Sequence, residues 1–155
     1  MSINIIIPIY NVEKYIEECV NSVVNQQNID FEIIAIDDGS TDLSLSIVQK
    51  MAEFEPRIKV FSYENAGLSV ARNRGIKHCT KQYAIFLDSD DRLHSGVLSN
   101  VYDEINELNV DCLFYGSSIF YDEDYFGKRI QYSYNRPKEL VGKVLNGHEI
   151  FNQFL

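Results

Sequence analysis

Two short apolar runs constrain the fold of this chain more than any other feature of its sequence. Asn4 to Ile9 reads NIIIPI, and Phe31 to Ile36 reads FEIIAI. Neither run alternates cleanly between polar and apolar residues, which is typical of strands that are buried on both faces of a parallel sheet. The runs therefore predict an α/β protein with a mostly parallel central sheet flanked by helices.

The segments around these runs show the spacing of amphipathic helices, so strands and helices are expected to alternate as βαβ units. After the strand at 4–9, the expected order is a helix to about Gln27, strand 31–36, a helix from Thr41 or Asp42 to Pro56, strand 58–61, helix 69–78, strand 83–87, helix 97–108 and strand 110–115. Ligands of such sheets bind beyond the carboxyl ends of the strands. The polar clusters after the first, second and fourth strands are therefore expected to meet at one edge.

An acidic cluster, Asp88-Ser89-Asp90-Asp91, directly follows the strand at 83–87. Mg²⁺ and Mn²⁺ prefer oxygen ligands, usually one or two carboxylates completed by water and phosphate. Residues two apart on an extended segment point the same way, so Asp88 and Asp90 can face one ligand. The alternative is that these carboxylates cap the next helix and solvate a turn.

Two further polar clusters follow other strands. In IAIDDGSTD, residues 34–42, Asp38 could accept a hydrogen bond from a base edge, or the segment could be an ordinary βα turn. In the segment 65–75, Ser69 is expected at a helix N-terminus, where backbone amides favour anions. Arg72, one turn later, could reach the same edge or pair with a nearby aspartate.

The end of the first strand supplies Pro8, which fixes the backbone, and Tyr10, which offers an aromatic face and a hydroxyl. A base or a sugar could stack on the Tyr10 ring, but a half-buried tyrosine that packs against its own helix is equally common.

Composition excludes some partners. The net charge of −9, without a basic run, argues against nucleic-acid binding, and no segment is apolar for long enough to span a membrane. The three cysteines, Cys19, Cys79 and Cys112, each lie in an apolar stretch and are expected to be buried free thiols.

In this order and at these spacings, the four clusters resemble one family, the nucleotide-sugar-dependent, inverting glycosyltransferases of family 2, which have the GT-A fold. The matching segments are Pro8–Asn11, Asp37–Asp42, Asn65–Gly75 and Phe86–Asp91. The resemblance covers the first two-thirds of the chain.

The resemblance implies a Rossmann-like donor-binding domain over residues 1–116, with residues 117–155 as an excursion and the start of an acceptor-side region. It implies that Pro8 and Tyr10 line the nucleotide pocket and that Asp38 binds the base, most simply uracil, with Arg72 supporting that region. Asp88 and Ser89 would lie near the ribose and diphosphate. Asp90, with Asp88, would hold Mn²⁺ or Mg²⁺.

The implied reaction moves a sugar from a UDP-sugar to the hydroxyl of a glycan or lipid-linked acceptor, in bacterial polysaccharide or cell-surface glycan synthesis. The catalytic base is expected beyond Leu155. The expected location is the cytoplasm, or the inner face of the membrane.

Two other functions compete with this one. A sugar-phosphate nucleotidyltransferase requires a glycine-rich, basic phosphate-binding loop after the first strand. Residues 8–13 of this chain, PIYNVE, contain neither glycine nor a basic residue. A non-catalytic nucleotide-binding module would retain the pocket and lack the base.

Overall fold

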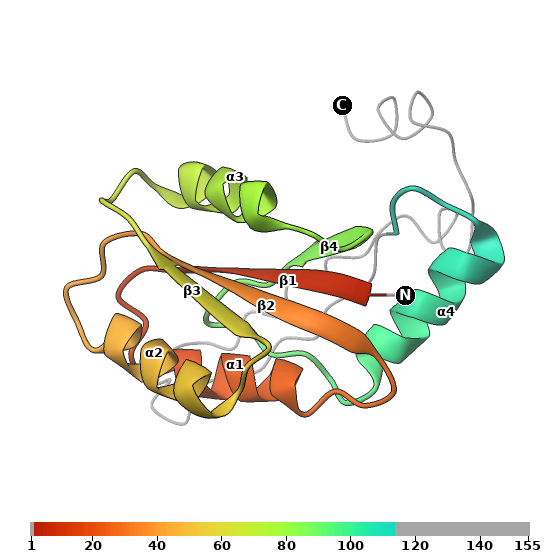
Figure 1. Cartoon of the computed structure of the whole chain (residues 1–155), viewed down its shortest axis with the longest axis horizontal. Coiled ribbons are helices and arrows are strands. Elements are labelled where there is room, and N and C mark those ends of the chain that lie inside the picture. The colour runs from red at the N-terminus through yellow and green to blue at the C-terminus, as the bar shows by residue number, and fades with distance from the viewer. Residues whose placement is uncertain (1, 114–155) are drawn as a thin grey trace, which may run out of the picture. The chain divides into compact units, whose positions relative to one another are not determined.

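The structure is a computed structural model of the 155-residue chain that describes residues 2–113. It divides into two compact units, Met1–Asn100 and Val101–Leu155, and the sheet lies in the first. The elements, in chain order, are β1 (Ser2–Ile9), α1 (Ile16–Val24), β2 (Asp30–Asp37), α2 (Ser44–Phe54), β3 (Ile58–Ser62), α3 (Leu68–His78), β4 (Tyr83–Phe86) and α4 (Val97–Leu108) (Figure 1).

The four strands form one parallel sheet in the order β3-β2-β1-β4. From β1 the chain moves to β2 and β3 on one side, whereas β4 pairs with β1 on the other side. The strand order therefore reverses between β1 and β4. A crevice opens at the carboxyl ends of the strands at such a point, and ligands bind there in α/β proteins.

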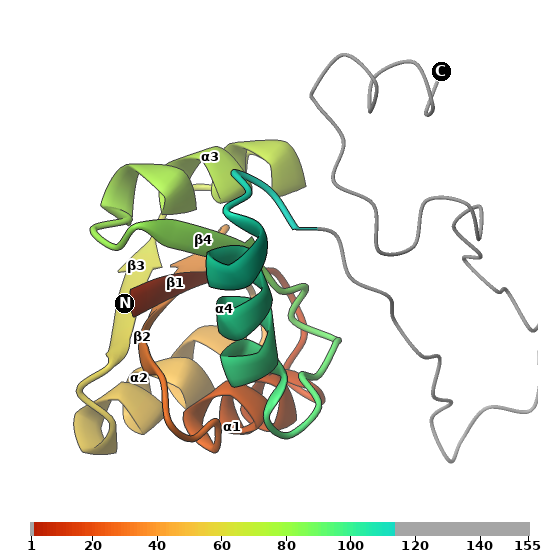
Figure 2. The same ribbon diagram turned by 90° about the vertical axis from the view of Figure 1, so that its right-hand side faces the viewer.

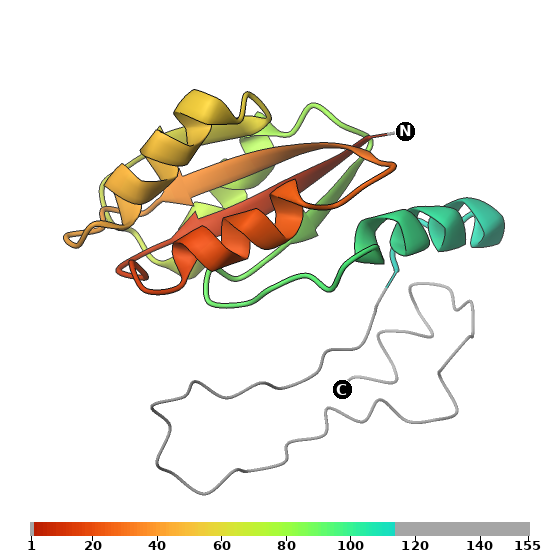
Figure 3. The same ribbon diagram turned by 90° about the horizontal axis from the view of Figure 1, so that it is seen from below.

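Helices cover both faces of the sheet. In Figures 1 and 2, α3 lies on one face and α1 and α2 lie on the other. Figure 3 shows α1 and α2 side by side over this face of the sheet. The α3 helix packs on β1 and β2, and α2 packs beside β3. This three-layer arrangement explains why the central strands are apolar on both faces.

The core follows the two-residue period of the strands. On β1, the odd-numbered isoleucines pack into the cluster under α1 and α2, and Ile6 packs with Ala71 under α3. The odd-numbered positions are Ile3, Ile5, Ile7 and Ile9, which are at most 1% exposed.

A proline in the central strand β1 is tolerated because its neighbour ends early. The pairing of β4 with β1 stops at Phe86 opposite Ile6, and the Leu87 amide donates the last bond to the Ile6 carbonyl. Pro8 lies two residues further along and so faces the same side, beyond the end of β4. Its missing N–H therefore leaves no ladder bond unmade.

The predicted fold class and order of elements are confirmed, with ends that differ by a few residues. The strand expected at 110–115 is not: residues 110–113 are not in a strand, and 114 and 115 lie outside the described residues, as does the region 117–155. Without a strand to bury it, Cys112 is exposed, contrary to expectation, whereas Cys19 is buried and Cys79 is half-buried. No helix within residues 2–113 is both long and apolar enough to cross a bilayer.

Candidate functional site

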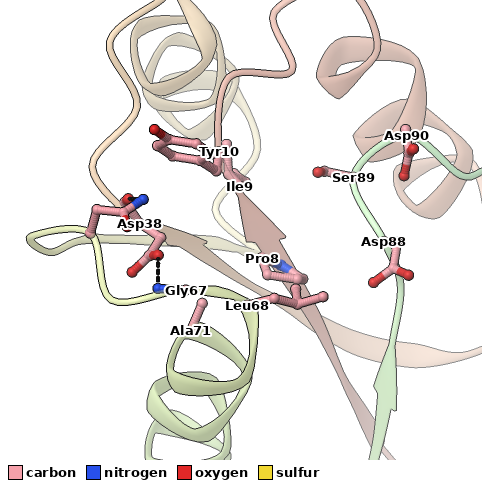
Figure 4. A pocket seen from close by; sticks show the side chains of 11 residues that line it. Pro8, Ile9, Tyr10, Asp38, Gly67, Leu68, Ala71, Asp88, Ser89 and Asp90 are labelled. Carbon is pink, nitrogen blue, oxygen red and sulfur yellow. Dashed lines mark hydrogen bonds between the residues drawn. The ribbon is translucent and has the colours of Figure 1, made fainter.

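A pocket of about 480 Å³ lies at the carboxyl ends of β1, β2 and β4 (Figure 4). On one side of it lie Asp38 and Gly67, and on the other lie the side chains that follow β4. Its lining residues are Pro8, Ile9, Tyr10, Asp38, Asn65, Gly67, Leu68, Ala71, Asp88, Ser89 and Asp90. Loops from separate βα units therefore meet at one rim.

The acidic loop, residues 88–91, forms one side of the pocket. The Asp88 carboxylate accepts a hydrogen bond from Arg72 of α3 at 2.5 Å, and the guanidinium lies 5.8 Å from the centre of the Phe86 ring. The buried Cys19 thiol donates to the Asp88 carbonyl oxygen at 3.6 Å. Burial, followed by the charges of the three aspartates, raises the pKa of Cys19 to about 12. The thiol therefore stays protonated and serves as a donor.

Negative charge accumulates along this loop. The pKa of Asp91 is raised, first by partial desolvation and then by the charges of Asp90 and Asp88. Among the ion pairs within residues 2–113, Arg72 pairs with Asp88 and with no other carboxylate of the loop. A further cation close to Asp90 would relieve the remaining repulsion.

The donor set fits a hard divalent cation that is shared with a phosphate group. Within residues 2–113, no three His, Cys, Asp or Glu side chains gather into a ready-made cage. Mg²⁺ does not require such a cage, because one or two carboxylates complete its shell together with water and substrate phosphates. Asp88 and Asp90, which both line the pocket, supply oxygen ligands of that number and kind.

Asp38 forms the opposite side of the pocket and is only 3% exposed. Its carboxylate accepts hydrogen bonds from the amides of Ala66 at 3.1 Å and Gly67 at 2.7 Å, and from the Arg74 guanidinium at 2.8 Å. The anion expected at the N-terminus of α3 is thus supplied by the chain itself. The Ala66 amide is shared by both carboxylate oxygens, so each oxygen lies within hydrogen-bond distance of two donors.

The neighbouring Asp37 has a purely structural environment. Its carboxylate accepts from the Ser40 amide at 3.1 Å and from the Ser62 hydroxyl at 2.8 Å. Gly39 then turns the chain with φ +76°, and a Cβ there would lie 2.9 Å from the backbone nitrogen of Asn65. The DDG sequence therefore divides its roles, with Asp37 closing the turn and Asp38 facing the pocket.

Reciprocal hydrogen bonds between two loops support the rim near Tyr10, which is 51% exposed. The Thr41 amide donates to the Asn11 side chain at 2.8 Å, and the Asn11 amide donates to the Ser40 hydroxyl at 3.2 Å. The Glu13 amide donates to the Asp42 carboxylate at 3.0 Å. The loop after β1 is therefore fixed against the loop after β2.

The structure brings six of the seven residues expected at the site into this one pocket, namely Pro8, Tyr10, Asp38, Asp88, Ser89 and Asp90. Arg72 does not line it. Arg72 was expected to support the Asp38 region, but it pairs with Asp88, and Arg74 takes the place beside Asp38. Side chains two apart on a helix diverge by roughly 200°, so these arginines flank the buried Ala71–Gly75 stripe on opposite sides.

Sequence reasoning did not assign Arg74, Asn65 or Leu68 a role. A helical wheel on which Ala71 and Gly75 face the sheet would have placed Arg74 on the side of α3 opposite to Arg72. It would not have identified Asp38 as the partner, because that contact joins residues 36 positions apart.

A parallel sheet with a pocket at the reversal of strand order is the arrangement in which α/β proteins bind ligands. Comparison with known proteins makes the class specific. Residues 4–154 match the family model described as glycosyl transferase family 2, so the chain belongs to this family of enzymes.

The chain is similar to glycosyltransferase GlyA of Streptococcus pneumoniae, with 39% identity over 109 residues that cover 70% of this chain and 16% of GlyA. Among solved structures it resembles S. aureus TarS in complex with UDP-GlcNAc, with a TM-score of 0.64 and 35% identity over 69% of this chain and 32% of that chain. It also resembles the Pyrobaculum calidifontis mannosyltransferase PcManGT in complex with GDP-Man and Mn²⁺, with a TM-score of 0.63 and 26% identity over 66% of this chain and 32% of that chain. The fold is therefore GT-A, and the chain spans one third or less of these relatives.

Proposed function

We propose that this chain is the donor-binding part of an inverting glycosyltransferase that moves a sugar from a UDP-sugar to an acceptor hydroxyl with the help of Mn²⁺ or Mg²⁺. The observation that carries the proposal is that Asp38 and Asp90, from separate βα units, line the same pocket. Its volume of about 480 Å³ lies within the range of roughly 300–1,000 Å³ that is usual for ligand pockets. The nucleotide sugar in the similar TarS structure supports the choice of donor.

In this proposal the two sides of the pocket bind different parts of the donor. Asp38 accepts a hydrogen bond from the N–H of a uracil base, and the exposed ring of Tyr10 stacks on the base or sugar. Pro8 fixes the floor between them, because its ring restricts the backbone. Ser89 and Asp88 lie near the ribose and diphosphate, with Arg72 holding the Asp88 carboxylate.

Asp90, together with Asp88, would hold the divalent cation. When bound, the cation neutralises charge that develops on the diphosphate as the sugar–phosphate bond breaks. The Mn²⁺ in the similar PcManGT structure supports this assignment. Arg72 orients the Asp88 carboxylate, and the protonated Cys19 thiol anchors the backbone of the acidic loop.

Inversion requires a base on the face of the sugar opposite to the leaving group, to take the acceptor's proton. We assign that base to a carboxylate that follows Leu155, and the acceptor-side region to residues from 117 onward, with residues 1–116 binding the donor. We place the enzyme in the cytoplasm or at the inner face of the membrane, with a glycan or lipid-linked acceptor in polysaccharide or cell-surface glycan synthesis.

Calorimetric titration of the 155-residue chain with UDP, with and without Mn²⁺, tests the proposal. We expect Mn²⁺ to tighten UDP binding, and Asp90→Ala to abolish that gain. Asp30→Ala is the control, because Asp30 lies at the opposite, N-terminal end of β2 and pairs with Lys81. The proposal is wrong if neither UDP nor any nucleotide sugar binds at millimolar concentration. A UDP affinity that neither Mn²⁺ nor Asp90→Ala changes would favour a non-catalytic nucleotide-binding module.

A further inference from the structure

Arg74 joins three segments that are far apart in the sequence. Its guanidinium donates to the Asp38 carboxylate at 2.8 Å and to the Glu64 carbonyl oxygen at 3.0 Å. Asp38 follows β2, Glu64 follows β3, and Arg74 belongs to α3. One side chain therefore ties the end of a strand, a loop and a helix together at the pocket.

The same region contains a second layer of contacts. The side-chain amide of Asn65 donates to the Asp38 backbone carbonyl oxygen at 2.9 Å, and the Gly67 backbone amide donates to the Asp38 carboxylate at 2.7 Å. Asp38, Asn65 and Gly67 all line the pocket. We call these three residues the Asp38 wall.

An aromatic group holds the guanidinium of Arg74 from beneath. The Arg74 guanidinium carbon lies 4.6 Å from the centre of the Tyr63 ring, close enough for a cation–π contact. The Tyr63 hydroxyl is hydrogen-bonded to His78 Nε2 at 2.8 Å, and the His78 ring stacks on Phe61 at 3.6 Å. Because its support is itself fixed, Arg74 has little freedom to leave Asp38.

Charge explains why this contact is needed. The Asp38 side chain is only 4% exposed, and Arg74 is its ion-pair partner in the described part of the chain. A buried carboxylate that loses its cation must be protonated, be rehydrated or move. Each of these changes would weaken the hydrogen bonds that the Ala66 and Gly67 backbone amides donate to the carboxylate.

We propose that Arg74 is a positioning residue for the base-binding half of the pocket, which acts through Asp38 and the loop from Glu64 to Gly67. This role rests on the proposed function, since it assumes that the Asp38 wall binds a nucleotide base. Arg74 does not line the pocket. Its effect on binding is therefore exerted through the shape and charge of that wall.

The position of Arg74 gives its effect a distinctive signature. The proposed metal ligands lie in the acidic loop on the other side of the pocket, where Arg72 is the cation. Loss of Arg74 should therefore weaken UMP and UDP by the same factor, with or without Mn²⁺. Loss of Asp90 should affect only the gain in nucleotide affinity that Mn²⁺ provides.

The experiment compares the wild-type chain with Arg74→Met, Arg74→Lys and the matched control Arg57→Met. Arg57 has the same three kinds of partner away from the pocket: the Glu55 carboxylate at 2.6 Å, the Val24 carbonyl at 3.3 Å and the Phe31 ring at 4.2 Å. Dissociation constants for UMP and UDP are measured with and without Mn²⁺. Amide hydrogen exchange at Ala66 and Gly67 is measured without ligand.

We expect Arg74→Met to raise both dissociation constants about tenfold, equally with and without metal, and to speed exchange at Ala66 and Gly67. Arg74→Lys keeps the charge but cannot reach Asp38 and Glu64 with a planar group, so its effects should be intermediate. Arg57→Met should lower stability and leave binding unchanged. Should Arg74→Met fail to fold, Arg74→Lys supports the same comparison.

Two results would overturn the role of Arg74. One is nucleotide affinity and amide exchange in the folded Arg74 variants that equal those of the wild type. The other is an equal loss of affinity in Arg57→Met, which would mean that binding merely follows stability. If the wild type binds no nucleotide at all, the proposed function fails first and this role fails with it, and the wild-type titration distinguishes that case.

Discussion

Replacing Gly75 by alanine tests how closely α3 approaches the sheet. A Cβ at this position would lie 2.4 Å from Cγ2 of Ile6, more than 0.5 Å inside the 3.0 Å limit that real contacts respect. Ile6 cannot move away easily, because it is fully buried in the central strand β1 and its β-branched side chain is stiff. The helix or the strand must therefore shift.

Two opposing terms set the size of the effect. Glycine to alanine within a helix gains about 1 kcal/mol of intrinsic stability. Forcing an extra methyl group into a packed core costs about 1–3 kcal/mol, and the short contact places this site at the upper end. We therefore expect Gly75→Ala to reduce the free energy of unfolding by about 1–2 kcal/mol.

Urea unfolding followed by circular dichroism measures this difference. Asn73→Ala is the matched control, because Asn73 is exposed on the same helix, and it should be neutral or slightly stabilising. In an Ile6→Ala background, where Cγ2 is absent, Gly75→Ala should no longer destabilise the chain. A Gly75→Ala variant that is as stable as the wild type, or more stable, would refute the reasoning.

Two further predictions concern a buried amide side chain and a partly exposed ion pair. Asn4 is fully buried, and its side-chain oxygen accepts hydrogen bonds from the backbone amides of Thr80 at 2.9 Å and Lys81 at 2.8 Å. Asn4→Leu leaves both donors without a partner and should lower the free energy of unfolding, measured in urea, by about 2–4 kcal/mol. A smaller loss than that caused by Leu at the exposed position Asn73 would contradict this reasoning. The hydrogen bond from Arg57 lowers the pKa of Glu55 from 4.5 to about 2. The stability that this ion pair contributes is thus present above pH 4.5 and is lost as the pH falls toward 2. Because solvent screens the partly exposed Arg57, we expect Glu55→Gln to lower the free energy of unfolding by about 1 kcal/mol at pH 7 and not to change it near pH 2. A pH-independent cost would rule out the ion pair as its source.

The sequence predicted the fold because its signals are local. Sequence segments of a few residues are enough to predict buried strands and amphipathic helices, and the βαβ alternation allows few arrangements of the sheet. The strand expected at 110–115 shows the limit of such signals, because a local apolar run carries no information about which segment it would pair with. Residues 110–113 are not in a strand.

The site was predictable as a set of loops but not as a set of contacts. Parallel topology alone brings the segments after β1, β2 and β4 to one edge, so Asp38 and Asp90 could be assigned to one pocket. Which arginine meets which aspartate depends on the rotation of α3 about its own axis. That rotation is set by Gly75 against Ile6, a contact between residues 69 positions apart in the chain. The small residues Ala71 and Gly75 indicate which side of α3 faces the sheet, but not which aspartate each arginine meets.

A crystal structure of the 155-residue chain grown with UDP and Mn²⁺ tests the central claim most directly. The account predicts an anomalous Mn²⁺ peak bonded to an Asp90 carboxylate oxygen and to the diphosphate, with the uracil against Asp38 across the pocket. A Mn²⁺ peak away from the acidic loop, or a nucleotide bound outside the pocket between Asp38 and Asp90, would contradict it.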